Sequence, residues 1–127
     1  MRCVSTPCYI QIFRIYIVDR SSNEKALTNA IAIGAAHYKG IDGFVLNVGI
    51  IDPLCRIGDN TPLESWKHIF DINFFSLVTA IKAGLPYLRE SKLTGRIIFV
   101  SSGAAEKGNA GWGPYSATKA AMNSLCR

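Results

Sequence analysis

The 127-residue sequence lacks the cysteine and histidine clusters that would hold a metal ion. It has four cysteines, none in a Cys-x-x-Cys pair, and its two histidines, His37 and His68, do not lie at ligand spacing. Structural zinc sites draw their ligands from closely spaced cysteines and histidines. We therefore predict no metal site. The cysteines have the scattered spacing of reduced thiols, which favours a cytoplasmic protein.

Dense charge is also missing from the sequence. Charged residues make up 18% of the chain, and the 14 lysines and arginines are spread from Arg2 to Arg127 without a run, for a net charge of +5. A surface that binds nucleic acid needs its basic residues gathered in a patch. The scattered pattern favours an ordinary solvated surface, so we predict no nucleic-acid partner.

Long apolar runs are absent as well. No segment reaches the roughly 20 apolar residues that a transmembrane helix needs. The N-terminus has a basic start and an apolar stretch, but Gln11 and Arg14 interrupt that stretch and no small-residue cleavage site follows it. We predict no membrane span and no signal peptide. With 49% hydrophobic residues, the chain can bury a core as one domain over residues 1–127, of which 1–9 are expected to be irregular.

Short apolar segments alternate with helical ones along the chain. Strands are expected where isoleucine, valine and aromatic residues gather, at 8–18, 42–49 and 96–100. Helices are expected at 23–39, at 61–85 and from 114 onward, the last still running at residue 127. The order β-α-β-α-β-α predicts an α/β fold, in which a doubly wound parallel sheet carries helices on both faces.

Local signals predict where the helices begin and end. Two capping boxes, each a serine or threonine with a glutamate three residues later, predict the first two starts: Ser21 with Glu24, and Thr61 with Glu64. Proline fits the first position of a helix, as at Pro62 and Pro114. We expect the middle helix to weaken near Gly84 and Pro86.

Polar residues and a glycine fall where ligands bind in a doubly wound sheet, outside the carboxyl ends of the strands. Asn47 and Gly49 end the second strand, and Ser101 and Ser102 end the third. Tyr115 and Lys119 share one face of the last helix, because residues four apart are helical neighbours. The sequence therefore predicts a common site at this edge of the sheet.

Each of these features alone also fits a structural role. A Tyr-x-x-x-Lys pair arises by chance in many proteins, and a serine after a strand usually caps or turns the chain. Asn73 would be a buried polar residue that needs hydrogen-bond partners. Trp112, in a glycine-rich loop, could border a substrate or simply anchor the packing.

The order of the motifs, however, resembles that of the short-chain dehydrogenase/reductase family. The segments are "DGFVLNVG", "NFFS", "IIFVSSG" and "YSATK", with Ser102 thirteen residues before Tyr115. The resemblance runs from about Asp19 to the end of the chain. The stretch from "IIFVSSG" to "AAMNS" further resembles the carbonyl reductases of the sepiapterin and benzil reductase group.

The resemblance implies catalytic roles for four residues. Tyr115 would be the general acid in carbonyl reduction and the base in alcohol oxidation. A free phenol has a pKa of about 10, and a neighbouring ammonium such as that of Lys119 favours the phenolate. Ser102 would donate a hydrogen bond to the substrate oxygen as charge develops on it. Asn73 would hold, through its backbone carbonyl, a water that relays protons to Lys119.

The resemblance also implies a cofactor, a substrate class and a partner. The cofactor would be NADP(H), with NAD as the alternative, and the substrate a small ketone or other carbonyl compound. Lys119 would hold the nicotinamide ribose beside Tyr115, while Asn47 and Gly49 would lie along the cofactor. A full-length form would be a homo-oligomer, paired through 61–90 and 113–127.

The sequence also departs from the family pattern. The Gly-x-x-x-Gly-x-Gly run that brings backbone N–H groups to the cofactor pyrophosphate is absent. Tyr16 stands where the family often has an aspartate, and Val48 replaces its usual alanine. We expect a partial Rossmann-type domain, about half of a family member, without the first βαβ unit and the C-terminal part. The alternative function is a truncated, inactive remnant that at most associates with other chains.

Overall fold

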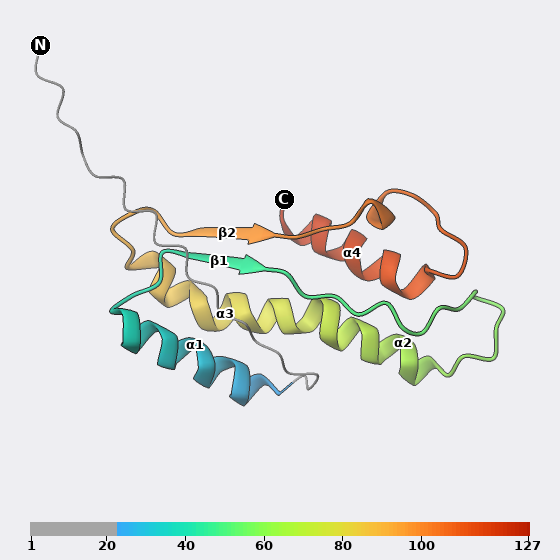
Figure 1. Cartoon of the computed structure of the whole chain (residues 1–127), viewed down its shortest axis with the longest axis horizontal. Coiled ribbons are helices and arrows are strands. Elements are labelled where there is room, and N and C mark those ends of the chain that lie inside the picture. The colour runs from blue at the N-terminus through green and yellow to red at the C-terminus, as the bar shows by residue number, and fades with distance from the viewer. Residues whose placement is uncertain (1–22) are drawn as a thin grey trace, which may run out of the picture.

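The computed structural model describes residues 23–127 (Figure 1). Its elements, in chain order, are α1 (Glu24–Tyr38), β1 (Gly43–Leu46), α2 (Leu63–Phe70), the π-helical turn η1 (Asp71–Phe75), α3 (Ser76–Arg89), β2 (Arg96–Phe99), the 3₁₀ turn η2 (Gly103–Ala105) and α4 (Gly113–Leu125). The two strands lie side by side and parallel, with Gly43 opposite Arg96 and Leu46 opposite Phe99. The predicted α/β alternation and parallel pairing are confirmed. The strand expected at 8–18 and the cap expected at Ser21 lie outside the described residues.

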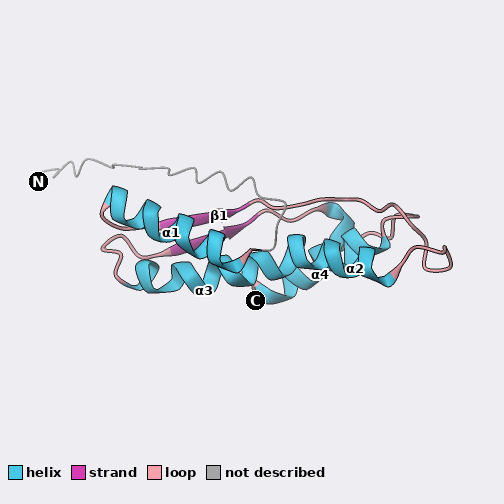
Figure 2. Cartoon of the chain, turned by 90° about the horizontal axis from the view of Figure 1, so that it is seen from below, coloured by secondary structure: helices cyan, strands magenta, loops and turns pink. Residues whose placement is uncertain are grey.

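The helices of residues 23–127 cover one face of this sheet. Phe44 and Leu46 point into a core that also contains Ile31 from α1, Leu77 from α3 and Met122 from α4. On the opposite face the neighbours Val45 and Ile98 are 55% and 56% exposed. Figure 2 shows α3 and α4 on the same side of the strands. The described residues thus supply the helices of one face of the predicted doubly wound sheet, and none of the described helices covers the other face.

The helix starts differ from the expected caps. Asn23 caps α1, because its Oδ1 accepts the N–H of Ala26 at 3.1 Å. The cap expected at Thr61 is wrong. Pro62 is still extended, with ψ at 141°, and its carbonyl accepts the N–H of Ser65 at 3.0 Å. Helix α4 carries a proline at its start as expected, but it ends at Leu125 rather than running to the last residue.

Helix α3 runs without a break through the positions where we expected it to weaken. It includes Pro86 and ends only at Arg89. At Gly84 the ring of Phe44 occupies the space that a Cβ atom would need. This glycine therefore lets β1 pack closely on α3, and the contact outweighs its poor helix propensity.

We expect Gly84→Ala to destabilise the fold despite the roughly 1 kcal/mol that alanine gains over glycine in a helix. The added methyl group meets the Phe44 ring, and overpacking of this kind costs about 1–3 kcal/mol. Urea denaturation should show the loss. In a Phe44→Leu background the same change should be neutral or stabilising. An equal loss in both backgrounds would rule out the ring as its cause.

The helical segment from Leu63 to Arg89 instead changes its winding at the π-helical turn. Ser76 donates its N–H to the carbonyl of Asp71, five residues back. The carbonyl of Ile72, the acceptor that this N–H would use in an α-helix, receives the Ser76 hydroxyl instead. The serine thus satisfies both carbonyls of the widened turn. Such turns are rare and are often found at functional sites.

By length and composition alone, this 27-residue segment could cross a membrane. From the sequence we expected no membrane span. Two of its most buried side chains, Leu77 and Leu88, belong to the core. The core helix of a globular domain shows the same profile, so the hydropathy is weak evidence for a membrane span.

Candidate active site

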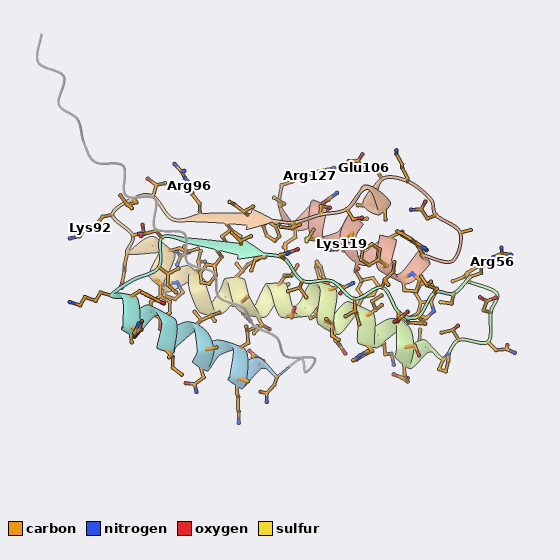
Figure 3. All side chains as sticks on the ribbon, viewed as in Figure 1. Arg56, Lys92, Arg96, Glu106, Lys119 and Arg127 are labelled. Atoms are coloured by element: carbon orange, nitrogen blue, oxygen red, sulfur yellow. The ribbon has the colours of Figure 1, made fainter. Side chains whose placement is uncertain are left out.

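The segments that follow β1 and β2 meet the first turns of α4 at the carboxyl ends of the strands. The Nζ of Lys119 donates to the carbonyl of Val48 at 2.8 Å and to that of Val100 at 3.1 Å. Figure 3 shows Lys119 inside the ribbon, whereas Lys92 and Arg56 extend outward. One side chain of α4 therefore joins the ends of both strands.

Lys119 is a buried cation. Only 3% of the residue is exposed, and this burial lowers the pKa of its ammonium group below the ordinary 10.5. The two carbonyls take two of its three ammonium hydrogens, which leaves one N–H without an acceptor among residues 23–127. The nitrogen lies 5.8 Å from the centroid of the Tyr115 ring. The lysine can therefore hold one further oxygen while it faces the tyrosine.

Gly49 lies against this pair. A Cβ atom built on it would be 3.5 Å from the Lys119 Nζ and 3.8 Å from Cε2 of Tyr115. These are ordinary contact distances, so packing within residues 23–127 does not by itself require a glycine here. Gly49 and Asn47 are both exposed. Both are thus accessible at the edge of the sheet where the sequence placed them.

Asn73 is fully buried in the π-helical turn, and its side-chain amide is completely engaged. Its Oδ1 accepts the N–H of Ile50 at 2.8 Å, and its Nδ2 donates to the carbonyl of Ile50 at 2.8 Å. The second hydrogen of Nδ2 goes to the hydroxyl of Thr118 at 3.1 Å. The side chain therefore fixes the backbone after β1, and the role expected for the Asn73 backbone carbonyl stays a prediction.

Ser102 has a structural role that leaves its hydroxyl hydrogen without an acceptor among residues 23–127. Its Oγ accepts the N–H of Ala104 at 3.2 Å and so caps the turn η2, which packs against α4. A cap of this kind uses only a lone pair of the oxygen. Neighbouring Ser101 instead donates to Oδ1 of Asn123 at 2.6 Å on the exposed surface. Within the part of the chain that the structure describes, Ser102 therefore keeps a hydroxyl hydrogen available for a ligand, whereas Ser101 does not.

The loops beyond the two strands are joined next to Tyr115. The N–H of Cys55 donates to the carbonyl of Gly111 at 2.8 Å, and Cys55 forms an isolated parallel bridge with Trp112. The Trp112 ring packs edge-on against that of Tyr115, with centroids 6.0 Å apart and an interplanar angle of 84°. Trp112 therefore packs against Tyr115, which is one of the two roles that the sequence allowed. Its side chain is only half-buried, so part of the Trp112 surface next to Tyr115 remains exposed.

Sequence reasoning missed Thr118, which is 0% exposed and accepts the hydrogen bond from Asn73. Its hydroxyl donates to the carbonyl of Tyr115 at 2.7 Å. One signal in the sequence could have found it. A buried asparagine needs hydrogen-bond partners, and Thr118 is a polar residue next to Lys119 on the helix expected at the same site.

Comparison with known proteins places this geometry in context. The family model described as short chain dehydrogenase matches residues 11–127. A benzil reductase of Saccharomyces cerevisiae that forms (S)-benzoin is 36% identical over 115 residues, which are 88% of this chain and 43% of that protein.

Two solved structures are similar in fold. A short chain dehydrogenase/reductase of S. cerevisiae has a TM-score of 0.76 and 31% identity, over 82% of this chain and 40% of that one. A carveol dehydrogenase of Mycobacterium avium in complex with NAD has a TM-score of 0.79 and 26% identity, over 87% and 39%. The chain thus spans about two fifths of the length of these relatives.

Proposed function

Since the chain belongs to the short-chain dehydrogenase family, we propose that it forms the catalytic centre of an NAD(P)H-dependent oxidoreductase that reduces a small ketone or other carbonyl compound. The observation that carries this proposal is the buried ammonium of Lys119, held by two strand-end carbonyls and facing Tyr115. Because the Lys119 ammonium is buried, hydrogen-bonded and positioned next to Tyr115, we favour an enzyme over an inactive remnant.

In the proposed reaction, each side chain has a separate task. Tyr115 donates its phenolic proton to the oxygen of the substrate carbonyl, which becomes an alcohol, and the phenolate left behind is stabilised by the positive charge of Lys119. Ser102 donates its free hydroxyl hydrogen to the same oxygen as negative charge develops there. The nicotinamide cofactor, when bound, supplies the hydride. Tyr115 then recovers a proton from solvent, and the steps run in reverse for alcohol oxidation.

The residues present fit one end of such a cofactor. The remaining N–H of Lys119 suits a ribose hydroxyl, and the exposed Gly49 offers backbone next to it without a side chain. The sequence has no glycine-rich run for the pyrophosphate. We therefore assign these residues to the nicotinamide end only. We propose NADP(H), as the resemblance in sequence implies, with NAD, which the carveol dehydrogenase structure contains, as the alternative.

We further propose that the full-length protein is a cytoplasmic homo-oligomer. Two large apolar side chains of the helices that would pair, Leu63 and Phe75, are 65% and 53% exposed. Exposed apolar side chains on this helical segment support its burial against a second copy.

The function can be tested in a completed chain, in which the part of this chain that aligns with the yeast benzil reductase replaces its counterpart in that protein. We expect this protein to oxidise NADPH or NADH when a diketone such as benzil is added. Ser102→Ala should lower kcat on the order of 10²–10³-fold, the usual effect of losing one oxyanion donor.

Ser101→Ala is the matched control, because Ser101 bonds Asn123 at the surface and should leave the rate within about twofold. If Ser102→Ala lowers kcat by less than threefold, Ser102 has only its structural role in the turn. No ketone-dependent oxidation of either cofactor across a panel of carbonyl compounds would refute the proposed function itself.

A further inference from the structure

We propose that Thr118 is a positioning residue, which couples the backbone at Ile50 to the backbone of Tyr115 through the side chain of Asn73. The coupling itself follows from the hydrogen bonds. Its consequence for catalysis rests on the function proposed above.

The hydroxyl of Thr118 links two segments that are far apart in the sequence. Its single hydrogen goes to the carbonyl of Tyr115 at 2.7 Å, and its oxygen accepts from Nδ2 of Asn73 at 3.1 Å. The residue is 0% exposed, so solvent cannot replace either bond. A hydroxyl can donate one bond and accept another at the same time, which a methyl group of the same size cannot do.

Asn73 carries the link onward to the strand end. Its side-chain amide bonds both the N–H and the carbonyl of Ile50, at 2.8 Å each. The third hydrogen bond of this amide goes to Thr118 and fixes its orientation relative to α4. Without that bond, one Nδ2 hydrogen would be buried with no acceptor, which favours rotation of the amide away from Ile50.

Thr118 and Lys119, which are consecutive in α4, therefore hold the residues on either side of Gly49. Lys119 binds the carbonyl of Val48 directly, and Thr118 holds Ile50 through Asn73. The short stretch 48–50 is thus fixed against the same helical turn that carries Tyr115. We infer that Thr118 sets the position of the Tyr115 hydroxyl relative to this stretch.

Hydrogen exchange measured by NMR on the 127-residue chain tests the coupling without any assay of activity. Thr118→Val keeps the volume but removes the hydroxyl, whereas Thr118→Ser keeps the hydroxyl. We expect the Ile50 amide to exchange about tenfold faster or more in the valine variant and within about twofold of the original in the serine variant. The amide of Ile31, buried in α1, should be unchanged in both.

An unchanged Ile50 amide in Thr118→Val would overturn the coupling. Equal acceleration at Ile31 would do so too, since it would mark a general loss of stability. If the valine variant does not fold, the side-chain amide of Asn73 in the unaltered chain decides the matter. Protected Nδ2 hydrogens support the coupling, and hydrogens that exchange as fast as those of an exposed asparagine overturn it.

The catalytic consequence is tested in the completed chain. Thr118→Val should lower kcat on the order of tenfold with little change in the KM of the ketone, because misplacement of the acid affects the transition state rather than substrate binding. Thr118→Ser should restore most of kcat. A valine variant with faster Ile50 exchange but unchanged kcat would overturn the positioning role. A completed chain with no activity in any form would refute the proposed function, while the exchange experiment would still decide the coupling.

Discussion

Tyr115→Phe should abolish carbonyl reduction in the completed chain while leaving its affinity for NADPH within about twofold of the original. Only the transferable proton is removed, and general acid catalysis contributes on the order of 10²–10⁴-fold to a rate. The phenylalanine ring keeps the edge-on contact with Trp112, so the start of α4 should keep its structure. Steady-state oxidation of NADPH measures the first effect, and a fluorescence titration measures the second.

Tyr87→Phe is the matched control, because Tyr87 is a half-buried residue of α3 that packs against the core. It should leave both the rate and the cofactor affinity unchanged. If the Tyr115 variant keeps most of the reductase rate, another group donates the proton and the assignment of Tyr115 is wrong.

Lys119→Met should lower turnover and cofactor affinity together. Methionine fills a similar volume but removes the charge that stabilises the phenolate, the N–H proposed for the ribose and both bonds to the strand-end carbonyls. We expect kcat/KM to fall on the order of 10²-fold or more, with a weaker Kd for NADPH. Lys67→Met is the control, since Lys67 is exposed and its one ion pair among residues 23–127 is with Glu64, at 3.1 Å. A variant that lost turnover but bound NADPH normally would leave Lys119 without its cofactor role.

The same substitution has a consequence for stability that depends on pH. Burial lowers the pKa of Lys119 in the folded state below 10.5, so between the two pKa values the unfolded chain binds more protons at this position. The free energy of unfolding of the unaltered chain, measured relative to Lys119→Met, should therefore rise as pH increases toward 10.5. Urea denaturation across this alkaline range measures the difference. A difference that is flat or falls with pH would contradict a lowered pKa.

The sequence predicted those features that depend on local pattern. Alternating apolar segments and helical periodicity predicted β1, β2, α1, the helical segment that contains α2 and α3, and α4, although not the turns η1 and η2. The spacing of Tyr115 and Lys119 put both on one face of α4. Because the strands are parallel, their carboxyl ends lie at one edge, and residues that follow them are brought to the same place. The meeting of Gly49 with Tyr115 and Lys119 follows from topology alone.

What the sequence did not predict depends on tertiary contacts. Gly84 weakens an isolated helix, but in the fold the ring of Phe44 needs the space that it leaves. Thr118 resembles any threonine inside a helix until Asn73 lies against it, from 45 residues earlier in the chain. In each case the deciding partner is far away in sequence, where propensity carries no information.

The π-helical turn makes the length of the chain between Asp71 and Phe75 as important as its composition. Each residue of an α-helix turns the chain by about 100°, so deleting one residue here would rotate α2 against α3 by roughly that angle. Either Ile69 or Leu77 would then leave its buried position, and Asn73 could no longer face both Ile50 and Thr118. Insertions and deletions in this turn should therefore be selected against more strongly than substitutions, even though the turn lies inside a helix and contains none of the residues proposed to exchange protons with the substrate.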